Sequence, residues 1–177
     1  LYRCGPIFLY RRSNLIQKTI TTIDNISEKI GSFIAWLTLA MLFMTCCIVL
    51  ARYALNIGSI AMQEAVMYMH GIVFMLGIPY TLKHRGHVRV DIIHQKLSTK
   101  GKAYIDTFGT LVFLFPVSIF LFLSSLDYVA FSWSVYETSA MPGGLPGVFI
   151  IKTLIPVMAI LLFLQGIADL LLSLIHI

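Results

Sequence analysis

The chain has 177 residues, of which 58% are hydrophobic and only 12% are charged, whereas soluble domains average roughly half and a quarter. A soluble fold of this length has too little polar surface to cover so much apolar side chain, so we exclude a soluble domain and expect most of the chain to lie in lipid. The net charge of +5 fits contact with anionic phospholipid, and the basic residues lack the interleaved aromatic side chains of a nucleic-acid platform, so no nucleic acid is expected as a partner.

Residues 13–29, SNLIQKTITTIDNISEK, form the first predicted element. Ile16, Ile20, Ile23 and Ile26 recur at helical spacing, and polar residues fill the other face. This pattern predicts an amphipathic helix that lies on the cytoplasmic membrane surface and leads into the first span. The alternative is a solvated leader with no fixed position.

Four windows almost free of charge predict membrane spans at about residues 30–51, 62–82, 104–130 and 147–173. The first window alone reaches roughly 33 Å as a helix, enough for a hydrocarbon core of about 30 Å. The fourth window contains Lys152, but this lysine is near the start of the window, where its long side chain can reach the interface. We therefore expect an all-α membrane protein with four transmembrane helices in a single membrane domain, residues 1–177. A soluble bundle would need polar faces that these windows lack.

Basic residues predict the orientation of the spans. Five precede the first span and six lie in the basic loop 83–102, whereas only Arg52 and Lys152 lie on the opposite side. Short cytoplasmic loops are enriched in lysine and arginine. We therefore expect both termini to be cytoplasmic.

The connector between the first two spans places Arg52 and Glu64 at the same external surface. We predict a structural ion pair between them, with an ion route through Glu64 as the less favoured alternative. The segment SAMPGGLPG, residues 139–147, predicts an external turn before the fourth span. The residues assigned to this turn and to the start of the last helix are Pro142, Gly143, Gly144, Pro146 and Lys152.

The basic loop opens with LKHRGHVRVDIIH, residues 82–94, the most polar passage of the chain. Read as one helix, it places His84, His87, Asp91 and His94 on one face, where they could bind a metal. Gly86 interrupts that helix, so we favour a turn followed by a short interfacial helix, and we expect no metal. We expect this loop to mark the cytoplasmic side of the membrane and to form a docking surface. The residues that we assign to these roles are Lys83, Arg85, Gly86, His87, Arg89 and Asp91.

No catalytic motif is present, so we do not expect an enzyme. Bound haem needs histidines from facing helices, and only His70 lies inside a span. Cys4, Cys46 and Cys47 lack the spacing of a zinc site, so no cofactor is expected. With so few interior polar groups, four helices cannot form a path for a hydrophilic solute, and the chain should need a partner.

Several motifs in order resemble the small membrane subunit of tripartite ATP-independent periplasmic (TRAP) transporters. The first set runs from Arg52-Tyr53 through Glu64 and Gly77 to RGHVRVD at 85–91. The second comprises the PGGLP turn at 142–146, Ile151-Lys152, Pro156 and LQG at 164–166. The resemblance covers about residues 30–172. The arginine-rich opening and the tail LSLIHI fall outside it.

The resemblance implies a non-catalytic permease subunit of the bacterial inner membrane. Such subunits scaffold a large multi-span membrane subunit that performs sodium-coupled uptake of an organic anion, a carboxylate or sulfonate. An extracytoplasmic binding protein delivers that anion. Two other functions remain open from the residues: a membrane-anchor subunit of a haem-binding redox complex, and a stand-alone scaffold protein.

Overall fold

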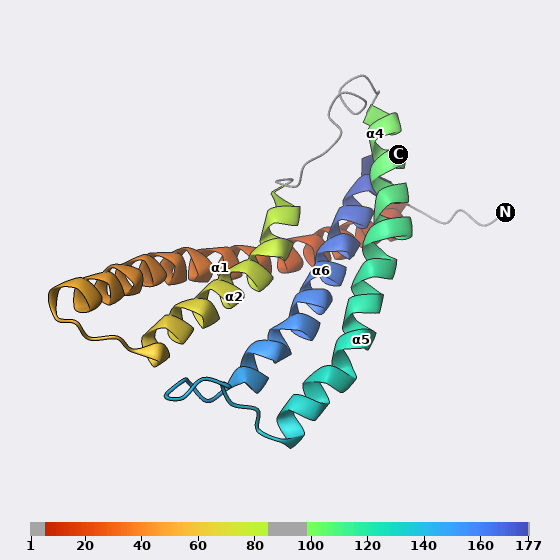
Figure 1. Cartoon of the computed structure of the whole chain (residues 1–177). Helices are drawn as coiled ribbons and strands as arrows, with labels where there is room; N and C mark the ends of the chain where they lie inside the picture. Colours follow the sequence, from red (N-terminus) through yellow and green to blue (C-terminus); the bar gives the residue numbers. More distant parts are fainter. Residues whose placement is uncertain (1–5, 85–98, 177) are drawn as a thin grey trace.

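The computed structural model describes residues 6–84 and 99–176, and helices make up most of both ranges (Figure 1). Four of the described segments are long and apolar enough to cross a membrane: Ile16–Ala54, Ile60–Lys83, Gly101–Ser134 and Val148–Ser173. The predicted class, an all-α membrane protein with four spans, is therefore confirmed. In chain order the elements are α1 (Pro6–Ala54), α2 (Ile60–Lys83), α4 (Thr99–Gly109), the π-helical turn η1 (Thr110–Leu114), α5 (Phe115–Ser134) and α6 (Val148–His176).

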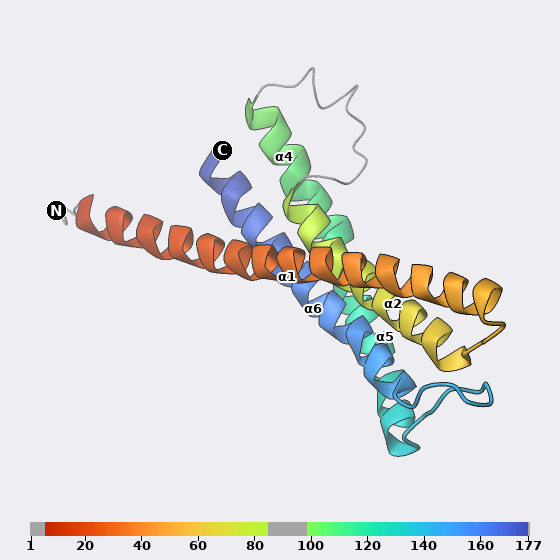
Figure 2. The same ribbon diagram turned by 90° about the vertical axis from the view of Figure 1, so that its left-hand side faces the viewer.

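The first helix differs from the expected one. We expected a surface helix over 13–29 and a separate span from 30, but α1 is one unbroken helix of 49 residues. At about 1.5 Å per residue it is roughly 74 Å long, more than twice a hydrocarbon core of about 30 Å. Ile20 and Ser27 are buried, whereas Ile26 is exposed, so one side of this part of α1 packs on protein. Its predicted place on the membrane surface stays a prediction. Figure 2 shows α1 crossing the other helices, with its N-terminal part projecting beyond them.

A short turn joins α1 to α2. Asn56 has a φ of 55°, in the left-handed region that asparagine tolerates better than most residues. The backbone N–H of Ile57 donates to the carbonyl of Ala51 at 3.0 Å and so completes the end of α1. Ser59 then caps α2, because its hydroxyl accepts from the N–H of Met62 at 3.4 Å. The turn returns the chain antiparallel to α1.

The third span is a single run of α4, η1 and α5. In η1 the N–H of Phe115 donates to the carbonyl of Thr110, five residues back. Pro116 follows directly, and a proline lacks the N–H of a normal helical turn and clashes with the carbonyl four residues before it. The wider π turn accommodates that proline inside a continuous span.

Small residues set the close packing of α5 on α6. Ser118, Ser125 and Ser132 recur every seven residues and are all buried, as are Ala159 and Gly166 on α6. A Cβ on Gly166 would lie 2.9 Å from the ring of Phe115 and would overlap Leu114. Small side chains of this kind let membrane helices approach closely.

The helices form a splayed bundle. α2 packs against α1 and α6, and α6 also packs against α5 and α4 (Figure 1). Gly31 of α1 provides the room for the ring of Tyr80 on α2. The short interfacial helix predicted after the second span falls within 85–98, outside the described residues.

Candidate functional site

Polar side chains gather at the two ends of the bundle. One group, here called the Gln165 cluster, comprises Asp24, Ser27, Glu28, Lys83, His84 and Gln165. The other, here called the Glu64 cluster, comprises Glu64, Tyr68, Ser139 and the backbone of Leu145. A third contact, the Lys152 pair, joins Lys152 to Glu137 close to the Glu64 cluster.

Gln165 lies at the centre of the first cluster and is 1% exposed. Its side-chain oxygen accepts from the hydroxyl of Ser27 at 2.8 Å, and its amide nitrogen donates to the carboxylate of Asp24 at 3.4 Å. A buried amide is costly unless it is hydrogen-bonded. These two contacts therefore fix the position of α6 relative to α1.

Lys83 connects the second helix to the same cluster. Its ammonium lies 2.7 Å from the carboxylate of Glu28 and donates to the backbone carbonyl of Asp24 at 2.9 Å. His84 also contacts the Glu28 carboxylate at 2.9 Å, and its ring stacks at a tilt on Tyr80, 4.4 Å between centroids. The last turn of α2 is thereby fixed to α1.

The Glu64 cluster holds the external loop against α2. Glu64 is 8% exposed, and its carboxylate accepts from the hydroxyl of Ser139 and from the backbone N–H of Leu145 at 2.6 Å. The hydroxyl of Tyr68, one turn further along α2, donates to the carbonyl of Leu145 at 3.4 Å. Each oxygen of the buried Glu64 side chain therefore accepts one hydrogen bond from the loop.

The loop itself is a compact hairpin over 135–147. Its two arms meet at the isolated bridge between Thr138 and Pro146, and the N–H of Gly144 donates to the carbonyl of Met141 at 3.0 Å. Gly143 has a φ of 77°, which favours glycine. A Cβ on Gly144 would lie 2.7 Å from a carboxylate oxygen of Glu64 and would overlap Ser139. The glycine at 144 thus allows the close approach of the loop to α2.

Lys152 contacts the same loop from α6. Its ammonium pairs with the carboxylate of Glu137 and lies 4.1 Å from the centre of the Tyr128 ring. The hydroxyl of Ser132 donates to Glu137 at 2.6 Å. The ammonium of Lys152, followed by the hydroxyl of Ser132, lowers the pKa of the Glu137 carboxyl below its ordinary value. The expected lysine at the start of the fourth span therefore reaches the interfacial loop and finds a charged partner there.

The structure gives Glu64 different partners from the one expected. Arg52 is exposed at the end of α1, and within 6–84 and 99–176 it is not among the partners of Glu64. The hairpin folds over α2 and supplies a hydroxyl and a backbone N–H to the carboxylate instead. Of the residues assigned to the basic loop, Lys83 joins the Gln165 cluster, whereas Arg85, Gly86, His87, Arg89 and Asp91 fall outside the described residues.

The sequence did not predict two hydrogen bonds, one between Ser27 and Gln165 and one between Ser132 and Glu137. The first pair is separated by 138 positions, so no local pattern connects its members. The pairing of Glu137 with Lys152 could have been predicted, because Glu137 is the only acid in the loop that precedes this lysine. The alternative metal set of His84, His87, Asp91 and His94 lies mostly in the undescribed loop, and the described residues contain no group of three potential metal ligands.

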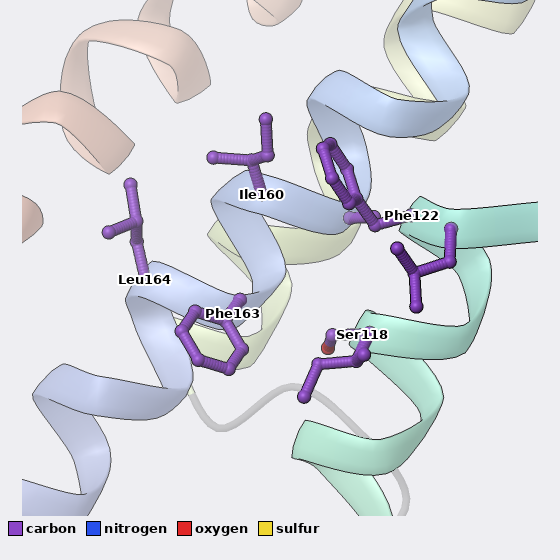
Figure 3. Close-up of a pocket in the computed structure, with 8 residues that line it drawn as sticks. Ser118, Phe122, Ile160, Phe163 and Leu164 are labelled. Atoms are coloured by element: carbon purple, nitrogen blue, oxygen red, sulfur yellow. The ribbon is translucent and has the colours of Figure 1, made fainter. Parts of the chain in front are cut away.

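An apolar groove of about 270 Å³ lies between α5 and α6. Figure 3 shows residues that line it, among them Ser118 and Phe122 of α5 and Ile160, Phe163 and Leu164 of α6. The hydroxyl of Ser118 donates to the carbonyl of Leu114 at 2.6 Å, so it is already satisfied within its own helix. The groove therefore offers a hydrophilic solute no free hydrogen-bond donor.

Comparison with known proteins gives one match. Residues 41–175 match a family described as tripartite ATP-independent periplasmic transporters, DctQ component. No curated protein and no solved structure matches the sequence. The matched range takes in the last part of α1, all of α2, α4, η1 and α5, and nearly all of α6.

Proposed function

Because this chain belongs to the DctQ family, the small membrane component of tripartite ATP-independent periplasmic transporters, we propose that it is a non-catalytic scaffold for a large membrane subunit. It is a multi-pass protein of the inner membrane. In the proposed complex, the large subunit carries out sodium-coupled uptake of an organic anion, a carboxylate or a sulfonate. An extracytoplasmic binding protein delivers that anion to the external surface of the complex.

The observation that carries this proposal is the position of the polar groups. Between residues 30–51, 65–82, 107–126 and 153–168, the described chain holds no Asp, Glu, Lys or Arg. The charged side chains of the two polar clusters and of the Lys152 pair lie outside these four stretches, and their hydrogen bonds are made within the chain. A route for an organic anion or for sodium needs several polar ligands that converge at membrane depth, and the described residues in these four stretches include no charged group that could act as one.

The same contacts support a scaffolding role. The Gln165 cluster joins α1, α2 and α6, while the Glu64 cluster and the Lys152 pair join α2, α5 and α6 through the external hairpin. Helices connected at both ends resist relative movement, as a fixed support for a moving partner requires. The hairpin also presents Tyr136 and Met141 with 69% and 62% exposure, and we propose this external surface as a contact for the binding protein.

The proposal is tested by co-expressing this chain with a large permease subunit and a secreted binding protein of the same family of transporters. We expect the large subunit to co-purify with this chain in detergent, and cells that express all three to take up the anion carried by the binding protein. Collapse of the sodium gradient should abolish uptake, whereas depletion of ATP at a maintained gradient should not. Failure of the large subunit to co-purify would contradict the scaffold assignment, and uptake that survives the loss of sodium would contradict the coupling.

A further inference from the structure

One face of α2 is left uncovered by the rest of the described chain. Gln63, Met67, His70 and Phe74 are all exposed, and their spacing of four, three and four residues places them on one side of the helix. Other faces of α2 are occupied. A methyl group at Gly71 would lie 3.8 Å from Ile151 of α6, and one at Gly77 would lie 3.6 Å from Ile34 of α1. We call the four exposed residues the α2 face.

His70 lies near the middle of the membrane. At about 1.5 Å per residue, it is roughly 15 Å from Ile60 at one end of α2 and roughly 20 Å from Lys83 at the other. Its side chain makes no hydrogen bond within residues 6–84 and 99–176. An imidazole always carries at least one donor or acceptor that needs a partner, and hydrocarbon provides none. An exposed histidine at this depth therefore points to a missing polar group.

Two hydroxyl side chains on exposed helix faces do not have this requirement. Thr45 donates to the carbonyl of Met41 at 2.8 Å, and Ser124 donates to that of Leu121 at 3.4 Å. Both hydroxyls are satisfied within their own helices, as short hydroxyl side chains can be. A histidine is too long and rigid to fold back in the same way. Its partner must come from outside the described helices.

We propose that the α2 face docks on the large membrane subunit, and that His70 meets a hydrogen-bonding group of that subunit at mid-membrane depth. This inference rests on the proposed function. Lipid tails could cover Met67 and Phe74 but would leave the imidazole unpaired, whereas a second protein can cover all three. The partner group is a side-chain amide, hydroxyl or carboxylate, or a backbone carbonyl exposed by an interrupted helix, since each can hydrogen-bond an imidazole across a helix interface.

The exposed face of η1 and α5 provides the contrast. Phe113, Val117, Phe120 and Leu123 are all at least half exposed, with exposures from 50% to 68%, and they are purely apolar. Such a surface is fully compatible with lipid. A central polar residue flanked by a flexible methionine and an aromatic ring is instead typical of a protein contact.

The test uses the full chain co-expressed with the large subunit in native membranes. A photo-crosslinking phenylalanine analogue is placed at Met67 or Phe74 on the α2 face, and at Phe120 on α5 as the matched control. We expect crosslinks to the large subunit from positions 67 and 74, and none from position 120. Crosslinks from position 120 alone, in a complex that still co-purifies, would overturn the inference and leave the proposed function standing. If the unsubstituted chain does not co-purify with the large subunit, the proposed function fails and this inference fails with it.

A second measurement isolates His70. We expect His70→Leu to weaken co-purification of the large subunit by about threefold to tenfold, in line with hydrogen bonds between membrane helices. His70→Gln, which keeps a donor and an acceptor, should retain most of the binding. Neither variant should lower the melting temperature of the isolated chain, because His70 has no partner among its described residues. If the His70→Leu chain co-purifies the large subunit as well as the unsubstituted chain does, the proposed role of the imidazole is wrong.

Discussion

Replacing Glu64 by alanine is expected to release the external hairpin from α2. The carboxylate accepts from the Leu145 N–H at 2.6 Å and from the Ser139 hydroxyl, and hydrogen bonds to charged groups contribute roughly 1.5–3 kcal/mol each. The hydroxyl can turn to another acceptor, but the backbone N–H cannot. We therefore expect a loss of about 3 kcal/mol in the free energy of unfolding.

For a chain of this size, a loss of about 3 kcal/mol corresponds to a fall of roughly 6–12 °C in melting temperature. The fluorescence of Trp133 reports the transition in detergent, because its indole N–H donates to Thr153 next to the hairpin. The control is Asp127→Ala, which removes an exposed acid from the half of α5 that leads into the hairpin. Arg52→Ala should also have little effect. A Glu64→Ala melting curve that coincides with that of Asp127→Ala would refute this account of the Glu64 cluster.

Three further predictions concern the other contacts. Gly144→Ala should destabilise the chain by about 1–3 kcal/mol in thermal melts, because the new methyl group would press on a carboxylate oxygen of Glu64. Gln165→Leu should cost about 1–3 kcal/mol in the same assay, because it leaves the buried hydroxyl of Ser27 without its partner on α6. The pKa of Glu137 is lowered by the ammonium of Lys152, so its stabilising effect is complete above the ordinary carboxyl range and is lost as the pH falls through the lowered value. Melting temperatures measured against pH should therefore fall at acidic pH, and Glu137→Gln should reduce that fall.

The two packing and hydrogen-bond variants have matched controls. Gly58→Ala adds a methyl group where no atom lies within 4 Å, and its melting temperature should stay close to that of the unsubstituted chain. Gln17→Leu changes an exposed glutamine of α1 and should likewise be neutral. Equal shifts in a variant and its control would show that the corresponding contact does not stabilise the fold.

The spans were predictable because lipid imposes a simple requirement on sequence. A segment that crosses the hydrocarbon core must be long and free of charge, and the windows around Ala40, Phe74, Phe120 and Ala159 meet it. The continuity of α1 was harder to infer, because a change from an amphipathic to a fully apolar pattern looks like a boundary. The chain has no proline between Ser13 and Ala54, and that absence was the available sign of one unbroken helix.

The polar contacts were less predictable than the spans. The charges at span ends are visible in the sequence, but their partners depend on how the connecting loops fold. Proximity in sequence pairs Glu64 with Arg52, whereas the hairpin brings Ser139 and Leu145 to it from 75 and 81 positions away. Gln165 and Ser27 meet only because α1 crosses α6, and no local pattern encodes that crossing.

The central claim, that this chain supports transport without performing it, is tested most directly by uptake into proteoliposomes under a sodium gradient. Vesicles are prepared with this chain alone and with this chain plus the large subunit, each in the presence of the loaded binding protein. We expect uptake only in the vesicles that contain both membrane subunits. Uptake by this chain alone at the rate of the full complex would contradict the claim.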